Sequence, residues 1–335
     1  MWDKIAGLTL DELFTSYPYA ADFFALPPTA AQQHYSLQAY FAALTEENLQ
    51  DIGMWREEYQ NQFTTFMIQM EQLRTVEEKV TSITILGGHD KDGRAENILL
   101  TIKPGEIICL VGPTGSGKSR LLADIEWIAQ RDTPTNRKIL INNKPPDPKR
   151  RFAVEHRLVA QLSQNINFIM DLTAAEFVRM HAESRLVEDI DEVTDHIINK
   201  ANELAGEKFS PATPVTALSG GQSRALMIAD TAFLSQSPIV LVDEIENAGI
   251  DRQRAVRLLV SEQKIVLMAT HDPILALMGD KRLIIRNGGI GQVIVTSDRE
   301  RQNLLKLEEL DRQLAAIRDT LRGGGRLDVL PANWG

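Results

Sequence analysis

The stretch Ile107–Ser119, which reads IICLVGPTGSGKS, decides the fold of this chain. Its apolar half, Ile107–Val111, has the length and composition of a buried strand, and a helical run follows at Leu121–Gln130. Glycines between a strand and a helix let backbone N–H groups wrap a phosphate chain, and the helix N-terminus adds a favourable dipole. We expect Lys118 to reach the β- and γ-phosphates of a nucleotide and Ser119 to ligate Mg²⁺. The complete phosphate-binding loop (P-loop) is Gly112-Pro113-Thr114-Gly115-Ser116-Gly117-Lys118-Ser119.

A second apolar run, Ile239–Val242, ends in the acidic pair Asp243 and Glu244. A carboxylate at the carboxyl end of a buried strand can hold the Mg²⁺ shell, and we assign that role to Asp243. Glu244 is then placed to orient and deprotonate an attacking water. A strand that ends in two acids is a weak signal alone, because strand ends are often solvated. Its place downstream of a complete P-loop favours the functional interpretation.

The motif Leu218-Ser219-Gly220-Gly221-Gln222 separates this chain from other nucleotide-binding proteins with a P-loop. With it, the chain resembles the ATP-binding cassette (ABC) ATPases, whose signature motif reads LSGGQ. Ser219, Gly220, Gly221 and Gln222 would open a helix whose N-terminus can face a γ-phosphate. In that family the motif meets the nucleotide held by the opposite subunit. The resemblance therefore implies a second ABC ATPase domain as partner, with a homodimer as the expected form.

Other positions of the family pattern follow in the family's order. Gln164 is the expected family glutamine, because it has the better spacing to Asp171–Ala174, and Gln161 is the alternative. By the resemblance, Gln164 helps to organise Mg²⁺ and water, and His271 in Ala269–Asp272 contacts the γ-phosphate. The resemblance covers roughly residues 82–296. It leaves the base contact open, since no aromatic residue lies between Phe66 and the P-loop and His89 is the only ring near the expected position.

The resemblance implies an α/β fold, a P-loop NTPase of ABC type with a β-rich subdomain, an α/β core and a helical subdomain at about 165–216. We expect the ABC ATPase domain over residues 81–297, after an all-helical accessory or docking domain over 1–80. A long helix is predicted from Trp55 to Lys79, with an apolar stripe that includes Trp55, Tyr59 and Phe63. A C-terminal helix is predicted from about Asp298 to Arg322, and together with a short tail it fills residues 298–335. Leu307, Leu310, Leu314, Ile317 and Leu321 form an apolar seam on that helix.

Composition limits the classes of partner. The formal net charge is −10, and residues 1–79 hold 12 acidic and 4 basic side chains. An acidic chain without a basic stripe argues against nucleic acid as the main ligand. The single cysteine, Cys109, cannot form an internal disulfide, which favours a reducing compartment. No apolar run approaches the ~20 residues of a membrane span, and no secretory signal is evident, so we expect a cytoplasmic chain that reaches a membrane only through a partner.

These features predict Mg²⁺-dependent ATP hydrolysis, with ATP and Mg²⁺ as ligands. The first hypothesis for its use is the ATP-binding subunit of an ABC transporter, docked on a separate transmembrane protein. The alternative is a soluble ABC-type ATPase that remodels or activates a cytosolic partner, such as a redox or metallocofactor enzyme. A nucleotide-gated scaffold without hydrolysis is disfavoured, because both Glu244 and His271 are present.

Overall fold

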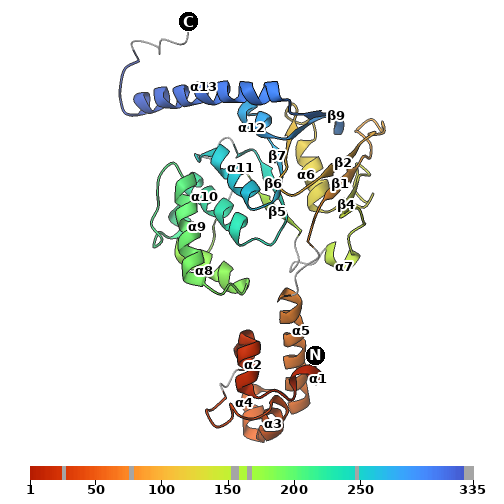
Figure 1. Ribbon diagram of the computed structural model, residues 1–335, viewed down its shortest axis with the longest axis vertical. Helices are drawn as coiled ribbons and strands as arrows, with labels where there is room; N and C mark the ends of the chain where they lie inside the picture. The colour runs from red at the N-terminus through yellow and green to blue at the C-terminus, as the bar shows by residue number, and fades with distance from the viewer. Residues whose placement is uncertain (25–27, 75–78, 152–157, 164–167, 246–248, 328–335) are drawn as a thin grey trace. The chain divides into compact units, whose positions relative to one another are not determined.

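The computed structural model describes residues 1–24, 28–74, 79–151, 158–163, 168–245 and 249–327, with the backbone alone at 72–74 and 149–150. The chain forms two compact units, Met1–Lys79 and Val80–Gly335. Each unit is described by itself below (Figure 1).

The N-terminal unit is built from short helices that begin at polar caps. Thr9 and Thr45 each form a capping box, Ser36 caps a third helix, and Gly53 ends the helix that Thr45 begins, with φ +74°. The elements are α1 (Trp2–Ile5), α2 (Leu10–Ser16), the 3₁₀ turn η1 (Pro18–Phe23), α3 (Leu37–Ala43), α4 (Glu46–Ile52) and α5 (Arg56–Arg74).

Aromatic side chains fill the core of this unit. Phe63 on α5 is fully buried and lies 5.1 Å from Phe23 and 5.7 Å from Phe41, measured between ring centroids. The buried stripe of α5 runs through Tyr59, Phe63 and Met67. The prediction that Trp55 belongs to this stripe is wrong, because Trp55 precedes the helix and is 82% exposed. The predicted end of the helix at Lys79 is not reached by α5, and residues 75–78 lie outside the described residues.

Two sheets organise the second unit. Strands β2 (Leu99–Ile102), β1 (Ile83–Leu86) and β4 (Lys138–Ile141) form an antiparallel sheet in that order. A six-stranded sheet has the order β5-β6-β7-β3-β8-β9, and only its last pair is antiparallel. Its strands are β3 (Ile107–Val111), β5 (Val159–Leu162), β6 (Ile239–Asp243), β7 (Ile265–Ala269), β8 (Lys281–Arg286) and β9 (Gly289–Val295). The expected β-rich sheet and α/β core are thereby confirmed.

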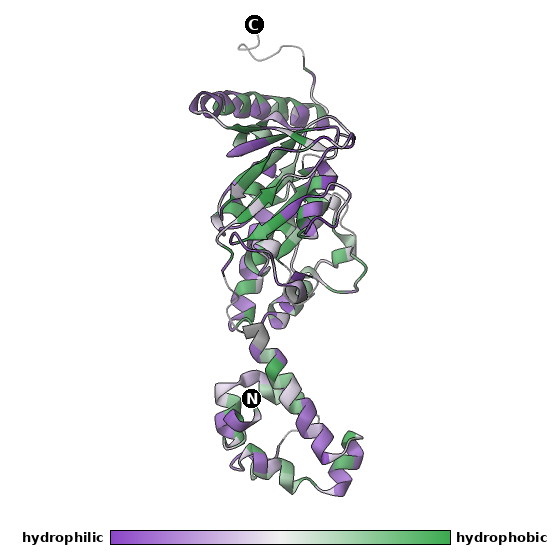
Figure 2. Ribbon diagram, turned by 90° about the vertical axis from the view of Figure 1, so that its right-hand side faces the viewer, coloured by the Kyte–Doolittle hydropathy of each residue, from purple (hydrophilic) through white to green (hydrophobic). Residues whose placement is uncertain are grey.

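Both faces of the six-stranded sheet are buried, which explains its continuous apolar runs. On β3, Ile108 and Leu110 enter the core shared with the small sheet and α6 (Lys118–Glu126), while Ile107 and Cys109 enter the core on the opposite face. That second core receives residues from α10 (Gly220–Phe233), α11 (Arg252–Ser261) and α12 (Pro273–Met278). Figure 2 shows the apolar strands between more polar helices. The short elements α7 (Pro148–Arg151) and η2 (Val215–Ala217) complete the connections.

Cys109 gives a test of this packing. Its thiol is fully buried, and burial raises its pKa to about 12 from an ordinary 9.0. Because the folded state holds the proton more tightly, this group stabilises the fold fully below pH 9 and loses that contribution between pH 9 and 12. We expect iodoacetamide at pH 8 to leave Cys109 unlabelled in the native protein and to label it in guanidinium, as read by intact-mass spectrometry. Rapid labelling without denaturant would contradict the buried assignment.

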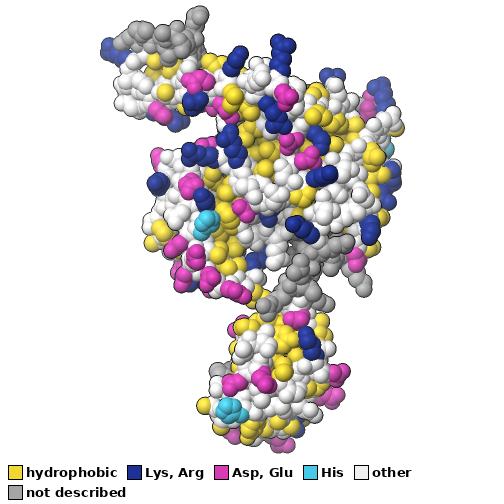
Figure 3. Space-filling model, in the orientation of Figure 1, with side chains coloured by type: hydrophobic (Ala, Val, Ile, Leu, Met, Phe, Trp, Pro, Cys, Tyr) yellow, Lys and Arg dark blue, Asp and Glu magenta, His cyan; other side chains and the backbone are white. Residues whose placement is uncertain are grey.

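The helical subdomain consists of α8 (Ala174–Ser184), α9 (Ile190–Leu204) and α10, packed around their own apolar core. Thr173 forms a capping box at the start of α8. Figure 3 shows acidic side chains gathered on its surface over α8 and α9. The predicted start at residue 165 lies outside the described residues.

Helix α13 spans Asp298–Arg322, as predicted, and packs on the unit through its first half (Figure 1). Leu304 and Leu307 lie against the core, and Arg252 bonds Asp311 at 2.7 Å. The seam is not buried as a whole, since Leu310 is 45% and Leu321 53% exposed. Among the described residues, Leu307 is the member of the seam that packs against the core of the unit. No helix among the described residues is long and apolar enough to cross a membrane.

Candidate functional site: the carboxyl ends of three neighbouring strands

The topology of the sheet brings three separate motifs together. Strands β6, β7 and β3 are parallel neighbours in that order. The Asp243–Glu244 pair, the His271 segment and the P-loop each follow the carboxyl end of one of these strands. Ligands of open α/β sheets bind at this end, so the arrangement makes a single site from segments far apart in the sequence.

The P-loop has the backbone that its sequence predicts. Gly115 and Gly117 have φ values of +78° and +107°, a region that L side chains rarely adopt. Gly117 is the N-cap of α6, so the helix starts at Lys118 rather than at Leu121. The helix ends at Glu126, earlier than the expected Gln130. Ile128 has φ +45°, which breaks the helix, and Gln130 then forms an antiparallel β-bridge with Lys138.

Lys118 occupies the centre of the site. Its side chain is buried, and its Nζ lies 2.8 Å from the carbonyl oxygen of Gly112, 3.3 Å from that of Pro113 and 3.1 Å from His271 Nε2. The ammonium group is therefore held inside the loop whose amides would surround a phosphate chain. Ser119 is exposed at the start of α6, and the buried hydroxyl of Ser116 has no hydrogen-bond partner among the described residues.

Glu244 and His271 face each other across the ends of β6 and β7. Glu244 Oε1 lies 3.7 Å from His271 Nε2, which is also the atom that contacts Lys118. Glu244 has φ +48°, a conformation that non-glycine residues adopt mostly where the surroundings impose it. The surroundings here include a hydrogen bond from its amide to the Ala269 carbonyl at 3.1 Å. Asp243, one residue earlier, is the last residue of β6 and pairs with Ala269.

The signature segment forms the start of α10. Ser219 Oγ accepts from the Gln222 amide at 3.3 Å, and Gln222 Oε1 accepts from the Ser219 amide at 2.8 Å, which completes a capping box. Ser219 and Gly220 are exposed, Gly221 and Gln222 are half-buried, and Gly221 Cα lies next to Gly249. Among the described residues, no hydrogen bond joins 219–222 to the P-loop of the same chain.

The predicted family glutamine, Gln164, lies outside the described residues. The alternative, Gln161, lies on β5. In the amide orientation that allows hydrogen bonding, its side-chain nitrogen lies 3.1 Å from Glu126 Oε1 and 3.3 Å from Glu126 Oε2. Gln161 thus sits within a strand and contacts the end of α6, and Gln164 stays the prediction for this role.

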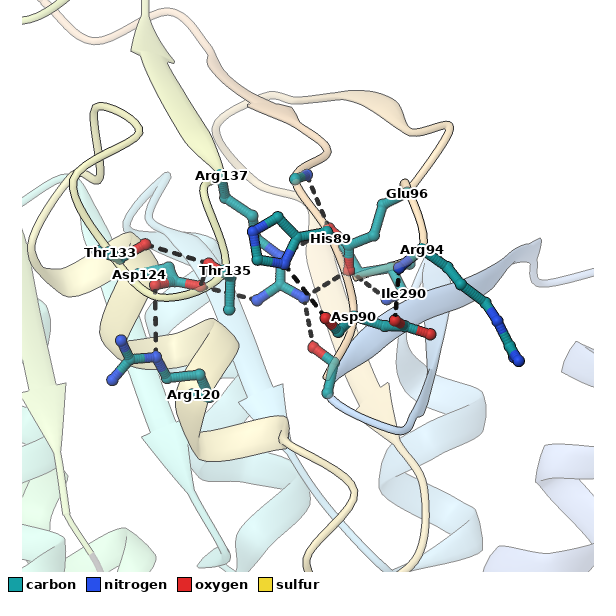
Figure 4. Close-up of polar contacts among 12 residues, drawn as sticks. His89, Asp90, Arg94, Glu96, Arg120, Asp124, Thr133, Thr135, Arg137 and Ile290 are labelled. Atoms are coloured by element: carbon teal, nitrogen blue, oxygen red, sulfur yellow. Dashed lines mark hydrogen bonds and ion pairs between the residues drawn. The ribbon is translucent and has the colours of Figure 1, made fainter. Parts of the chain in front are cut away.

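Sequence reasoning missed the segments that cover the P-loop from behind. The turn between β8 and β9 donates the Gly288 amide to the Ser116 carbonyl at 2.7 Å. Lys91, in the loop that also carries His89, reaches the Gly115 carbonyl at 3.3 Å. His89 Nδ1 lies 3.2 Å from the Asp90 carbonyl oxygen, in the loop drawn in Figure 4. The Asn287-Gly288-Gly289 run signals a turn in the sequence, but nothing in that run signals what the turn packs against.

The comparisons with known proteins point to one family. Residues 95–247 match the family model described as ABC transporter. The chain is 50% identical over 250 residues to an uncharacterized ABC transporter ATP-binding protein of Methanocaldococcus jannaschii, which covers 74% of this chain and 95% of that protein. It is also 31% identical over 198 residues to the lipoprotein-releasing system ATP-binding protein LolD of Psychrobacter arcticus, which covers 56% of this chain and 85% of LolD.

Solved structures show the same fold. The structure of cbiO1 from Clostridium perfringens, described as part of an ABC transporter complex, matches with a TM-score of 0.53 and 21% identity, over 73% of this chain and all of that chain. The ATP-binding subunit of another ABC transporter matches with a TM-score of 0.51 and 20% identity, over 70% of this chain and all of that chain.

Proposed function

Because this chain belongs to the family of ABC transporter ATP-binding proteins, we propose that it binds Mg-ATP and hydrolyses it within a closed dimer of two cassettes. One observation carries the proposal: Lys118, His271 and Glu244 converge at 3.1 and 3.7 Å, at the carboxyl ends of three adjacent strands. Lys118 can bind a phosphate oxygen, and Glu244 can accept a proton from water. With His271 beside both, the three groups are close enough to act on one phosphate group.

The P-loop and its lysine bind the phosphates in this proposal. The backbone amides of residues 114–119 supply donors, and Lys118 exchanges its contacts with Gly112 and Pro113 for phosphate oxygens. Ser119 and Asp243 offer hydroxyl and carboxylate oxygens, which are the ligands that Mg²⁺ prefers, and Gln164 is proposed as a further oxygen ligand. When bound, Mg²⁺ would neutralise charge on the phosphate oxygens.

Glu244 is proposed as the general base for the attacking water. His271 would hold both the γ-phosphate and Glu244 in place, because its Nε2 already lies between Lys118 and the Glu244 carboxylate. The catalytic contribution of these residues is mainly positioning and charge stabilisation, since phosphoryl transfer needs little covalent help.

The other half of the site is proposed to come from a second cassette. The start of α10, where Ser219 and Gly220 are exposed and Gly221 and Gln222 are half-buried, would face the γ-phosphate held by the partner's P-loop. Its exposure in one chain supports this assignment. Two cassettes would then enclose two nucleotides, and hydrolysis would reopen the pair.

We place this activity in a transporter, as the ATP-binding subunit that docks on a separate transmembrane protein. The relatives and solved structures named above are transporter components, and they lend no support to the alternative of a soluble remodelling ATPase. The unit Met1–Lys79 is proposed as an accessory docking domain, because it has its own aromatic core and a solvent-exposed Trp55. The ABC ATPase domain is proposed over 81–297, followed by the C-terminal helix and tail.

The native, untagged chain tests the transporter assignment. After gentle lysis we expect it to sediment with membranes and to co-purify with a protein of several membrane spans, identified by mass spectrometry. This follows because a chain without a predicted membrane span reaches the bilayer through a partner. If it stays in the supernatant with a cytosolic enzyme, transport is wrong and ATP-driven closure serves that partner instead.

A further inference from the structure

Arg137 is a fully buried arginine whose guanidinium joins three separate segments (Figure 4). It lies immediately before β4. Its Nε and Nη2 donate hydrogen bonds to the two carboxylate oxygens of Glu96, at 2.9 and 2.5 Å. Its Nη1 bonds Asp124 Oδ2 at 2.7 Å, and Nη2 also donates to the Gly288 carbonyl oxygen at 2.7 Å. The bidentate pair fixes the plane of the guanidinium, and so the direction of its remaining donors.

Glu96 and Arg137 stabilise each other's charged form. Burial alone would raise the pKa of Glu96, but Arg137 and the amides of Gly88 and Ile290 bring that pKa below its ordinary value. Burial would lower the pKa of Arg137, but Glu96 and Asp124 raise it. Glu96 and Arg137 therefore both stay charged around neutral pH. At the surface side, Arg120 Nε lies 3.8 Å from Asp124 Oδ1.

Each partner of Arg137 belongs to a segment that carries or contacts the P-loop. Asp124 is on α6, the helix that the P-loop opens. Glu96 closes the loop whose Lys91 reaches the Gly115 carbonyl. Gly288 accepts from Arg137 with its carbonyl, and donates its amide to the Ser116 carbonyl at 2.7 Å.

The β8–β9 turn and the P-loop are in close backbone contact. A Cβ atom built on Gly117 would lie 2.7 Å from Gly288 Cα, closer than real Cβ contacts occur. The turn at Gly288 is also bonded on its other side, because the Lys91 amide donates to the Asn287 carbonyl at 2.9 Å. A displacement of this turn would therefore move Ser116 and Gly117, whose amides belong to the proposed phosphate site.

We propose that Arg137 is a positioning residue for nucleotide binding: it holds the β8–β9 turn and α6 so that the P-loop keeps its phosphate-binding shape without a ligand. This inference rests on the proposed ATP binding. Stability alone does not require an arginine here, because apolar groups of similar volume often replace a buried ion cluster without loss. A hydrogen bond to the backbone of Gly288 fixes where the turn lies, and an apolar side chain cannot do that. Preorganised donors bind without the cost of ordering them.

The test compares Arg137→Met with Lys264→Met. Lys264 is also a buried cation bonded to backbone carbonyls, those of Ser235 and Ser237 at 2.5 and 3.2 Å. It lies at the amino end of β7, the end of the sheet away from the P-loop. Both variants lose a buried charge, so both are expected to unfold at lower denaturant concentration. Only loss of Arg137 is expected to affect the nucleotide site.

The measurement is the dissociation constant for ATP by titration calorimetry, at a temperature where circular dichroism shows each variant folded. We expect Arg137→Met to raise this constant about 10- to 100-fold, the range seen when groups that orient a binding site are removed. Lys264→Met should leave it unchanged. If Arg137→Met is unfolded, Arg137→Lys takes its place, since it keeps the charge but cannot bond Glu96, Asp124 and Gly288 together. A folded Arg137 variant that binds ATP as the wild type does would overturn the inference.

Hydrogen exchange separates failure of this inference from failure of the proposed function. If the wild type binds no ATP, the proposed function is wrong. The positioning claim is then still testable, because amides of residues 116–118 and 288 should exchange faster in the Arg137 variant than in Lys264→Met. Equal exchange in the two variants would contradict it without reference to any nucleotide.

Discussion

Replacing Glu244 by Gln is expected to stop ATP turnover while ATP binding continues. Glutamine has nearly the same shape, so the hydrogen bond of residue 244 to Ala269 and its place 3.7 Å from His271 are retained. It cannot take a proton from water, and loss of a general base lowers rates by about 10² to 10⁴-fold. The Glu244→Gln chain should therefore accumulate with ATP as a closed dimer. Phosphate release measures the rate, and sedimentation velocity with and without ATP measures the dimer.

The exposed Glu262, beyond the last residue of α11, offers a matched control. Glu262→Gln removes the same charge on the side of the amino ends of the strands, away from the carboxyl ends that carry the site, and is expected to hydrolyse ATP like the wild type. Fast turnover by Glu244→Gln would remove Glu244 from the proposed role and leave another group to activate water.

Replacing Lys118 by Ala is expected to abolish tight ATP binding. The ammonium group sits inside the P-loop, bonded to two loop carbonyls and to His271. Hydrogen bonds to a charged partner contribute about 1.5–3 kcal/mol each, and two such bonds to phosphate would be lost, which predicts at least about a hundredfold weaker binding. Titration calorimetry with ATP measures the change. Unlike Glu244→Gln, this variant should show no ATP-dependent dimer.

Lys103→Ala provides the comparison, because Lys103 is an exposed lysine of the same unit just before β3. It should bind ATP as the wild type does. Unchanged ATP affinity in Lys118→Ala would mean that the P-loop amides alone bind the phosphates. Lys118 would then only stabilise the conformation of the loop.

Local features were predictable because their causes are local. A capping box needs only residues three apart, so the helix starts at Thr9, Thr45 and Thr173 follow from the local sequence. The phosphate-binding backbone of Gly115 and Gly117 follows from the freedom of glycine at positive φ. The bounds of α13 follow from its polar cap and from the glycines after Arg322.

Predictions failed where burial depends on what else packs nearby. Trp55 fits the spacing of the α5 stripe, but it precedes the helix and stays in solvent. The seam on α13 has the right period along its length, yet only the Leu307 end meets a core. Periodicity says which residues share a face, and only the tertiary structure says whether that face is covered.

The sequence by itself determined the family pattern and the chemical groups: a P-loop, an acidic pair, a histidine and a signature helix start. The tertiary structure decided which of them meet. Lys118 and His271 are 153 residues apart, and Arg137 and Gly288 are 151 apart. The strand order β5-β6-β7-β3-β8-β9, which depends on long-range pairing rather than on neighbouring residues, brings Lys118 and His271 together. Arg137 stands before β4 of the smaller sheet, and it meets Gly288 only where that sheet packs beside the β8–β9 turn. Arg137 belongs to no motif of the sequence. It contacts the segments around the P-loop only after β4, α6 and the β8–β9 turn have packed together.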